Sequence, residues 1–190
     1  MTQTDFSYRA LTTSTWDDFE EVMGGNGGAK GCWCMHWRVS FEEWEKGRGD
    51  GNRSALKKRV RKKSPPPGLI GYVDGKPAAW LAIADRSEYA RLQRSPVTKA
   101  IDDEDAWVIS CIYVHRDYRG QGLQAKMIDA ACKYAKDQKQ SLVEGFPVEP
   151  GDRKLGADSA MTGVASAFIA NGFKEVARRK SDRPAMRKRL

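Results

Sequence analysis

The sequence lacks any hydrophobic run of the ~18 residues that a membrane-spanning helix needs. Its four cysteines, at positions 32, 34, 111 and 132, do not form the framework of a small secreted disulfide module. The first residues show neither the basic nor the apolar region of a secretory signal. These absences predict a soluble, reduced protein of the cytoplasm, with no membrane as a partner.

Internal repeats are absent as well, and what is present is an ordinary globular composition. The chain has 190 residues, of which 40% are hydrophobic and 31% are charged. That length suits one domain with a substantial core. No composition shift marks a linker, so we expect a single domain over residues 1–190. Its helical part should span about 7–63 and its sheet-rich part about 69–190.

The net charge of +8 is concentrated in two segments. Residues 53–63 carry seven basic side chains and no acidic one, and residues 174–190 carry a net charge of +6, so the other 162 residues sum to −5. The plainer interpretation of 53–63 is a solvated helix with Leu56 and Val60 on its apolar side. The alternative is a surface for nucleic acid, a membrane or a phosphorylated ligand. The overall charge alone does not predict a nucleic-acid partner.

Hydrophobic periodicity and turn residues predict a helical first part and a mixed second part. In the first part we expect a short strand from residue 7, a helix capped by Thr15, a glycine-rich loop at 24–31, helices at 40–47 and 53–63, and a loop at 47–52 between them. In the second part we expect strands at 69–73, 78–83, 107–114, 141–146, 173–179 and 184–188, and helices at 123–138 and 162–170.

The junction between the strand at 107–114 and the following helix indicates a phosphate site. Gly120 and Gly122 allow a ligand to approach the backbone at the start of a helix, where N–H groups and the positive end of the helix dipole point outward. Arg119 adds a guanidinium fork beside them. The alternative is a glycine-rich turn that only joins strand to helix.

A dinucleotide site is a competing interpretation of the same residues. Gly120-Gln-Gly122-Leu-Gln-Ala125 matches the G-x-G-x-x-A fingerprint, and Glu144 follows at about the distance of a ribose-binding acid. However, five residues separate Val114 from Gly120, and only 46 residues follow Glu144. These counts disfavour a Rossmann fold, which needs further βα units.

A family resemblance accounts for more of the chain. Val114-His-Arg-Asp-Tyr-Arg119-Gly-Gln-Gly122-Leu resembles the acetyl-CoA pyrophosphate loop of the GNAT family of N-acetyltransferases, V-x-x-x-x-(R/Q)-x-x-G-x-(G/A). Ser166-Ala-Phe-Ile-Ala-Asn-Gly-Phe173 is similar to the late signature of that family. The order of the expected elements agrees from residue 7 onward. The resemblance implies an α/β (α+β) fold: a mixed, mostly antiparallel sheet flanked by helices and splayed between the fourth and fifth strands.

The resemblance also implies a function and a set of site residues. It implies an acyl-CoA-dependent N-acyltransferase that moves acetyl from acetyl-CoA to a primary amine by direct attack, with no metal. The implied acetyl-CoA contacts are Ile112, Val114, Arg119, Gly120, Gln121, Gly122, Leu123 and Gln124. The acceptor, either a small-molecule amine or a peptide or protein amine, stays open, and so does a homodimer.

The sequence departs from the family pattern where protons are handled. Gln124 replaces the usual Gly or Ala, so the loop is expected to be more open or the amide to contact the cofactor. Phe168 replaces the usual Tyr general acid, and Val108 and Ser110 stand where a Glu or His base is often found. We therefore assign the base to Glu144, with Ser110 holding a water. The alternatives for Glu144 are binding an acceptor ammonium or pairing with an arginine.

Cys32-Trp-Cys34-Met-His36 offers only three zinc ligands, so we expect no metal there. Its aromatic residues indicate either plain core or a wall near the acceptor site. Cys111 could be an acyl nucleophile, but core packing is the preferred interpretation. The missing Tyr and strand base leave a second function open, a non-catalytic acyl-CoA-binding regulator with a basic nucleic-acid-binding surface.

Overall fold

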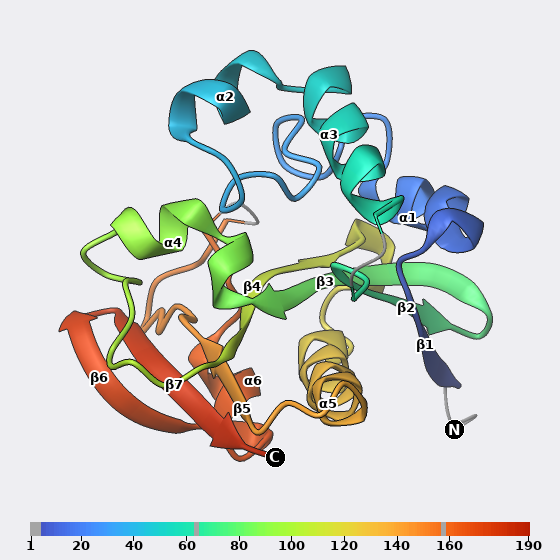
Figure 1. Ribbon diagram of the computed structural model, residues 1–190. Helices are drawn as coiled ribbons and strands as arrows, with labels where there is room; N and C mark the ends of the chain where they lie inside the picture. Colours follow the sequence, from blue (N-terminus) through green and yellow to red (C-terminus); the bar gives the residue numbers. More distant parts are fainter. Residues whose placement is uncertain (1–4, 63–64, 157–158) are drawn as a thin grey trace.

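The computed structural model describes residues 5–62, 65–156 and 159–190 (Figure 1). Their strands form one sheet in the order β1-β2-β3-β4-β5-β7-β6, in which only β4 and β5 pair in parallel. The sheet therefore has the predicted mixed, mostly antiparallel character. The strands are β1 (Phe6–Ala10), β2 (Gly68–Val73), β3 (Lys76–Asp85), β4 (Trp107–Val114), β5 (Leu142–Gly145), β6 (Lys174–Lys180) and β7 (Arg183–Arg189).

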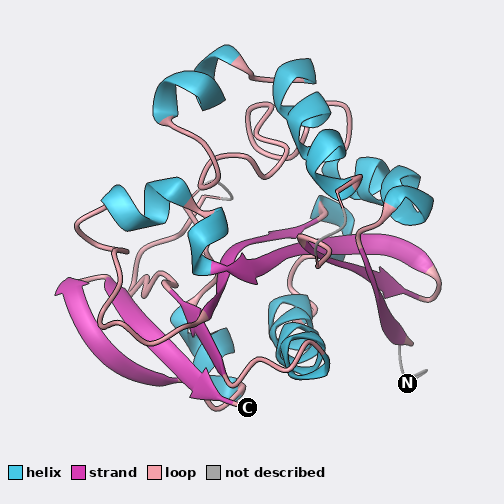
Figure 2. Cartoon of the chain, in the orientation of Figure 1, coloured by secondary structure: helices cyan, strands magenta, loops and turns pink. Residues whose placement is uncertain are grey.

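Helices cover both faces of the sheet (Figure 2). One face carries α1 (Trp16–Met23), α2 (Phe41–Lys46), α3 (Asp50–Val60) and α4 (Ala90–Arg94), and the other carries α5 (Leu123–Asp137) and α6 (Ala165–Ala170). Short 3-10 turns lie at Thr13–Thr15, Arg86–Glu88 and Arg116–Tyr118. Among the helices of the described ranges, none has both the length and the apolar character to cross a membrane.

The side chains of strand β3 show why helices pack on both faces of the sheet. Its side chains alternate between two cores, because successive residues of a strand point to opposite faces. Leu81 and Ile83 pack with α5 and α6, whereas Trp80 packs with α1 and with the Cys32–Met35 segment. The apolar run in this part of the sequence is thus buried because it forms a central strand between two helical layers.

Two helices begin at residues other than those predicted. Helix α3 begins at Asp50, inside the stretch expected to be loop, and Gly49 with φ +79° sets its start. Helix α6 begins at Ala165 rather than at 162, because Gly163 has φ +81° and Val164 is extended. Lys63 and Ser64, which the sequence placed at the end of the basic helix and after it, lie outside the described residues.

The central strand is irregular where it meets its neighbours. Strand β4 pairs with β5 only over Trp107–Ile109, and then continues alone on that side to Val114, while β5 ends at Gly145. On the other side the register with β3 shifts so that Ser110 forms a β-bulge. The predicted splay between these two strands is therefore present.

Candidate functional site

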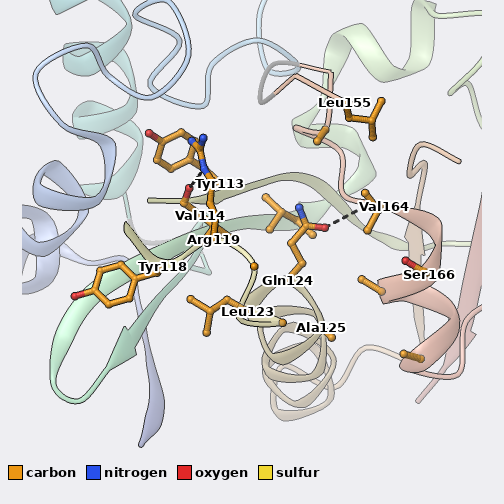
Figure 3. A pocket seen from close by; sticks show the side chains of 16 residues that line it. Tyr113, Val114, Tyr118, Arg119, Leu123, Gln124, Ala125, Leu155, Val164 and Ser166 are labelled. Atoms are coloured by element: carbon orange, nitrogen blue, oxygen red, sulfur yellow. Dashed lines mark hydrogen bonds between the residues drawn. The ribbon is translucent and has the colours of Figure 1, made fainter. Parts of the chain in front are cut away.

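A cavity of about 560 Å³ lies beside the part of β4 that has no pairing with β5 (Figure 3). Its wall comes from β4, the loop after it, the first turn of α5, α6 and the segment before α6. The lining residues are Ile112, Tyr113, Val114, Tyr118, Arg119, Gly120, Gly122, Leu123, Gln124, Ala125, Leu155, Ala160, Val164, Ser166, Ala167 and Ala170. The structure thus brings seven of the eight sequence-predicted acetyl-CoA contacts to one cavity.

The glycine loop forms a cradle at one end of this cavity. Gly120 has φ +75° and Gly122 has φ +72°, the left-handed region that favours glycine. A Cβ atom added at either position would meet no protein atom within 4 Å, so a side chain would extend into open space. Gly122 is the N-cap of the 15-residue helix α5, whose first N–H groups lack intrahelical acceptors and whose dipole favours an anion there. The cradle fits a phosphate or diphosphate.

Arg119 is fixed beside the cradle by its own backbone contact. Its Nε donates to the carbonyl oxygen of Val114 at 3.1 Å, which holds the guanidinium at the edge of the cavity (Figure 3). Gln121, the eighth predicted contact, does not line the cavity, since its Nε2 lies 3.4 Å from the carbonyl oxygen of Asp117. Only its backbone belongs to the cradle.

The free side of β4 already has a partner within the chain. The N–H of Ile112 donates to the carbonyl oxygen of Met161 at 2.7 Å. The family resemblance implied that Ile112 contacts acetyl-CoA, and the sequence gave no signal for Met161, because the segment before α6 has no recognisable motif. A ligand that pairs with Ile112 has to displace the Met161 carbonyl.

Gln124 connects the two helices that border the cavity. Its Oε1 accepts a hydrogen bond from the N–H of Val164 at 3.2 Å, which links the first turn of α5 to the N-cap of α6 (Figure 3). The residue is half-buried and lines the cavity. The Gln124 amide thus stands in place of the small residue of the family pattern and bridges α5 and α6 at the cavity wall.

Ser110 is not part of the cavity wall. Its side chain is buried beside the Tyr89 hydroxyl, which accepts from Arg38 Nη2 at 3.3 Å. Burial raises the pKa of this tyrosine. Ser110, one of the two residues that the sequence assigns to proton transfer, therefore faces a buried polar cluster under α4.

Glu144 is enclosed by two arginines. The carboxylate is fully buried, Arg187 Nε donates to its Oε2 at 2.7 Å, and Arg86 Nη2 forms an ion pair with its Oε1. Burial and the neighbouring Arg187 lower the pKa of Arg86 to about 10, still well above neutral pH. Glu144 does not line the cavity. This placement argues against the predicted base and favours the ion-pair alternative, because a carboxylate held by two cations is a poor proton acceptor.

Asp102 and Glu104, which precede β4, are also paired with arginines. Arg187 donates to both oxygens of Asp102, at 2.6 and 2.9 Å, which lowers the pKa of Asp102 to about 2. Glu104 accepts two hydrogen bonds from Arg189. This network ties the start of β4 to β5 and β7.

Phe168 occupies a packed position. It is fully buried, and a Cβ atom at Gly145 would lie only 2.3 Å from its ring. The ring fills the space beside β5, with Phe173 edge-on to it at 5.0 Å. Phe168, at the position of the usual general acid, therefore serves core packing in this chain.

A second cavity of about 130 Å³ adjoins the first along β4. It shares Ile112, Tyr113 and Arg119 with the larger cavity and is otherwise lined by Met23, Gly28, Ala29, Cys32, Cys34, Cys111 and Met161. The cysteine-tryptophan segment thus belongs both to the core and to a cavity wall. No group of three or more metal-ligating side chains comes together within the described ranges. His36 Nδ1 instead lies 3.1 Å from Arg91 Nη1.

The structure has the arrangement that the motifs implied. A parallel pair of strands separates, and glycines at a helix N-terminus line the cavity beside it. The chain belongs to the family whose model, described as Acetyltransferase (GNAT) family, matches residues 32–149. No match was found among curated proteins.

Solved structures share the fold at low sequence identity. The PaiA N-acetyltransferase from Thermoplasma acidophilum, in complex with coenzyme A, is 16% identical with a TM-score of 0.55, over 98% of this chain and 99% of that chain. A GNAT-family acetyltransferase from Listeria monocytogenes is 15% identical with a TM-score of 0.56, over 97% and 95%. Agmatine N-acetyltransferase is 9% identical with a TM-score of 0.55, over 98% and 100%.

Proposed function

We propose that the protein is an acyl-CoA-dependent N-acyltransferase that moves an acetyl group from acetyl-CoA to a primary amine. The observation that carries the proposal is the glycine cradle at the N-terminus of α5, open to a 560 Å³ cavity beside the part of β4 that has no pairing with β5. Membership of the GNAT family and the coenzyme A bound to the PaiA relative support it. On this proposal residues 1–190 act as one N-acetyltransferase domain.

The donor is oriented by backbone groups. Its diphosphate lies against the N–H groups of residues 120–124, with Arg119 beside it. Its pantetheine arm runs along β4, pairing with Ile112 and Val114. The Met161 carbonyl leaves the Ile112 N–H when the arm enters, since one N–H cannot serve both partners.

The reaction is a direct transfer. The amine nitrogen attacks the thioester carbonyl carbon, the C–N bond forms, and the C–S bond breaks. The coenzyme A thiolate leaves, and it or a water takes the proton that the amine nitrogen loses. Only the unprotonated amine has the electron pair for this attack, so the site has to favour the neutral amine.

Release of coenzyme A tests the proposal. Acetyl-CoA incubated with a panel of primary amines is expected to give coenzyme A and acetylated amine in equal amounts, as measured by thiol titration and mass spectrometry. Binding of acetyl-CoA with no turnover of any amine would support the non-catalytic regulator instead.

The regulator is the second candidate because the end of α3 and the two residues after it present basic side chains. Lys58, Arg61 and Lys62 are all exposed, next to the half-buried Val60. If this surface is only solvated, replacing the three by Gln should leave kcat/KM for a small amine unchanged. If it binds nucleic acid, wild-type affinity for duplex DNA should fall steeply with salt, and the replacement should flatten that slope. We expect the first result. Salt-dependent DNA binding near micromolar Kd would contradict it.

A further inference from the structure

The smaller cavity has the position that an acceptor amine needs, if the proposed donor site is correct. It meets the larger cavity at Ile112, Tyr113 and Arg119, so a thioester beyond the pantetheine arm would lie at its entrance. Its far wall is the loop of residues 28–34, on the opposite side from α5. A molecule in this cavity would therefore approach the carbonyl from the side away from coenzyme A.

The wall of this cavity is apolar and rich in sulfur. Cys32, Cys34 and Cys111 supply thiols, and Met23 and Met161 supply thioethers. Among the described residues that line it there is no aspartate or glutamate, and Arg119 is the one ionic side chain among them. A cavity of this kind stabilises an apolar body and offers no partner to a second ammonium group.

Carboxylates of the surrounding cap are engaged elsewhere. Tyr72 donates its hydroxyl to Asp18 at 2.6 Å. Glu20 pairs with Arg53 at 2.6 Å, and Glu88 pairs with Arg59 at 2.8 Å. Glu20 and Glu88 are thus paired with cations of the chain, which weakens their attraction for a polycationic acceptor, whereas Asp18 keeps its charge because its partner is a neutral hydroxyl.

The thiols lie among buried polar groups. The buried indole N–H groups of Trp44 and Trp80, near Cys32 and Cys34, have no hydrogen-bond partner among the described residues. The Cys111 thiol lies beside that of Cys34. The contact with Cys111 lowers the pKa of Cys34, while the contact with Cys34 and burial raise the pKa of Cys111.

The backbone of the wall is strained. Trp33 has φ +44° and Cys34 has φ +58°, in the left-handed region that costs free energy for residues other than glycine. Gly27 makes room for the Trp33 indole, since a Cβ there would lie 2.1 Å from its Nε1. Strain that the surrounding packing maintains at a cavity wall is typical of functional sites.

We propose that this cavity is the acceptor subsite and that its substrates are small primary amines with an apolar body and no second charge. A cavity of about 150 Å³ holds a benzene ring, so the volume here suits a body of about five or six carbons. The apolar wall lowers the pKa of a bound amine, because burial away from water disfavours the ammonium form. The wall thereby supplies the neutral nucleophile without a carboxylate base.

The test compares amines at saturating acetyl-CoA. From ethylamine to pentylamine, kcat/KM should rise about fourfold for each added methylene, which corresponds to about 0.8 kcal/mol. It should fall for chains that exceed the cavity. Pentane-1,5-diamine and agmatine should be at least about 100-fold worse than pentylamine, because their second cation has no partner. Equal or better kcat/KM for the diamines would overturn the proposal.

A variant keeps the test falsifiable. Ala29 lines the cavity and is half-buried, so Ala29→Asp adds a carboxylate to the wall. We expect it to raise the diamine-to-pentylamine ratio of kcat/KM at least about tenfold, while Ala29→Asn, of equal size but uncharged, leaves the ratio unchanged. An equal effect of both variants would contradict the proposal.

Donor binding separates the two proposals. Acetyl-CoA that binds and is consumed only with cationic amines would refute the acceptor class and leave the transferase intact. Acetyl-CoA that binds while no amine of the series reacts would also refute it. A protein that binds no acyl-CoA would refute the proposed function itself.

Discussion

Gly122→Val is expected to abolish the stabilisation of the protein by acetyl-CoA. At about 100 times its Kd, the ligand should stabilise the wild-type fold by about 2.7 kcal/mol. For a chain of this size that is a rise of about 5–11 °C in Tm. The valine side chain would extend into the cradle and would strain a residue with φ +72°. Thermal unfolding with and without acetyl-CoA measures the shift.

Gly75→Val is the matched control for this prediction. Gly75 lies in the turn between β2 and β3, has φ +77°, and likewise has no protein atom within 4 Å of an added Cβ. It lines neither cavity, so its variant should lose stability through the same backbone strain and keep the acetyl-CoA shift. An undiminished shift in Gly122→Val would place the donor outside the cradle.

Glu144→Ala should cost about 3–5 kcal/mol of folding stability, because it leaves Arg86 and Arg187 in a buried region without the carboxylate between them. The corresponding fall in Tm is about 6–20 °C. At temperatures where the variant is folded, kcat should fall less than tenfold. Urea unfolding and steady-state kinetics on the same preparation measure both effects.

Glu104→Ala provides the comparison. Glu104 pairs with the exposed Arg189, and surface pairs of this kind contribute at most about 1 kcal/mol. A Glu144→Ala variant of wild-type stability whose kcat fell about 10²–10⁴-fold would restore Glu144 as the general base.

Most of the fold could be predicted because the signals are local. The apolar runs Leu69–Val73 and Ala78–Ile83, joined by a glycine-containing turn, and the apolar run Trp107–Val114 predict the central strands, and all three are present. The cradle could be predicted equally well from the sequence, since Gly120 and Gly122 stand at a strand-to-helix junction whose backbone requires positive φ. Residues whose role follows from their own backbone conformation can be located from sequence.

The rest depends on contacts between distant segments. Glu144 looked like a base because the strand around it is apolar, but its partners Arg86 and Arg187 lie 58 positions before it and 43 after it. Met161 reaches Ile112 from a loop that carries no motif. The cavity wall at Cys34 and Cys111 likewise joins a loop to a strand that lies far along the chain. Single-sequence patterns do not encode such pairings.

A crystal structure of the protein with bound acetyl-CoA tests the central claim most directly. We predict the diphosphate on the N–H groups of residues 120–124, the pantetheine arm hydrogen-bonded to Ile112, and the Met161 carbonyl displaced from that N–H. The acetyl group should lie beside Cys111, at the entrance to the smaller cavity. A donor bound elsewhere, with the bond between Ile112 and Met161 intact and the cradle not in contact with phosphate, would contradict the account.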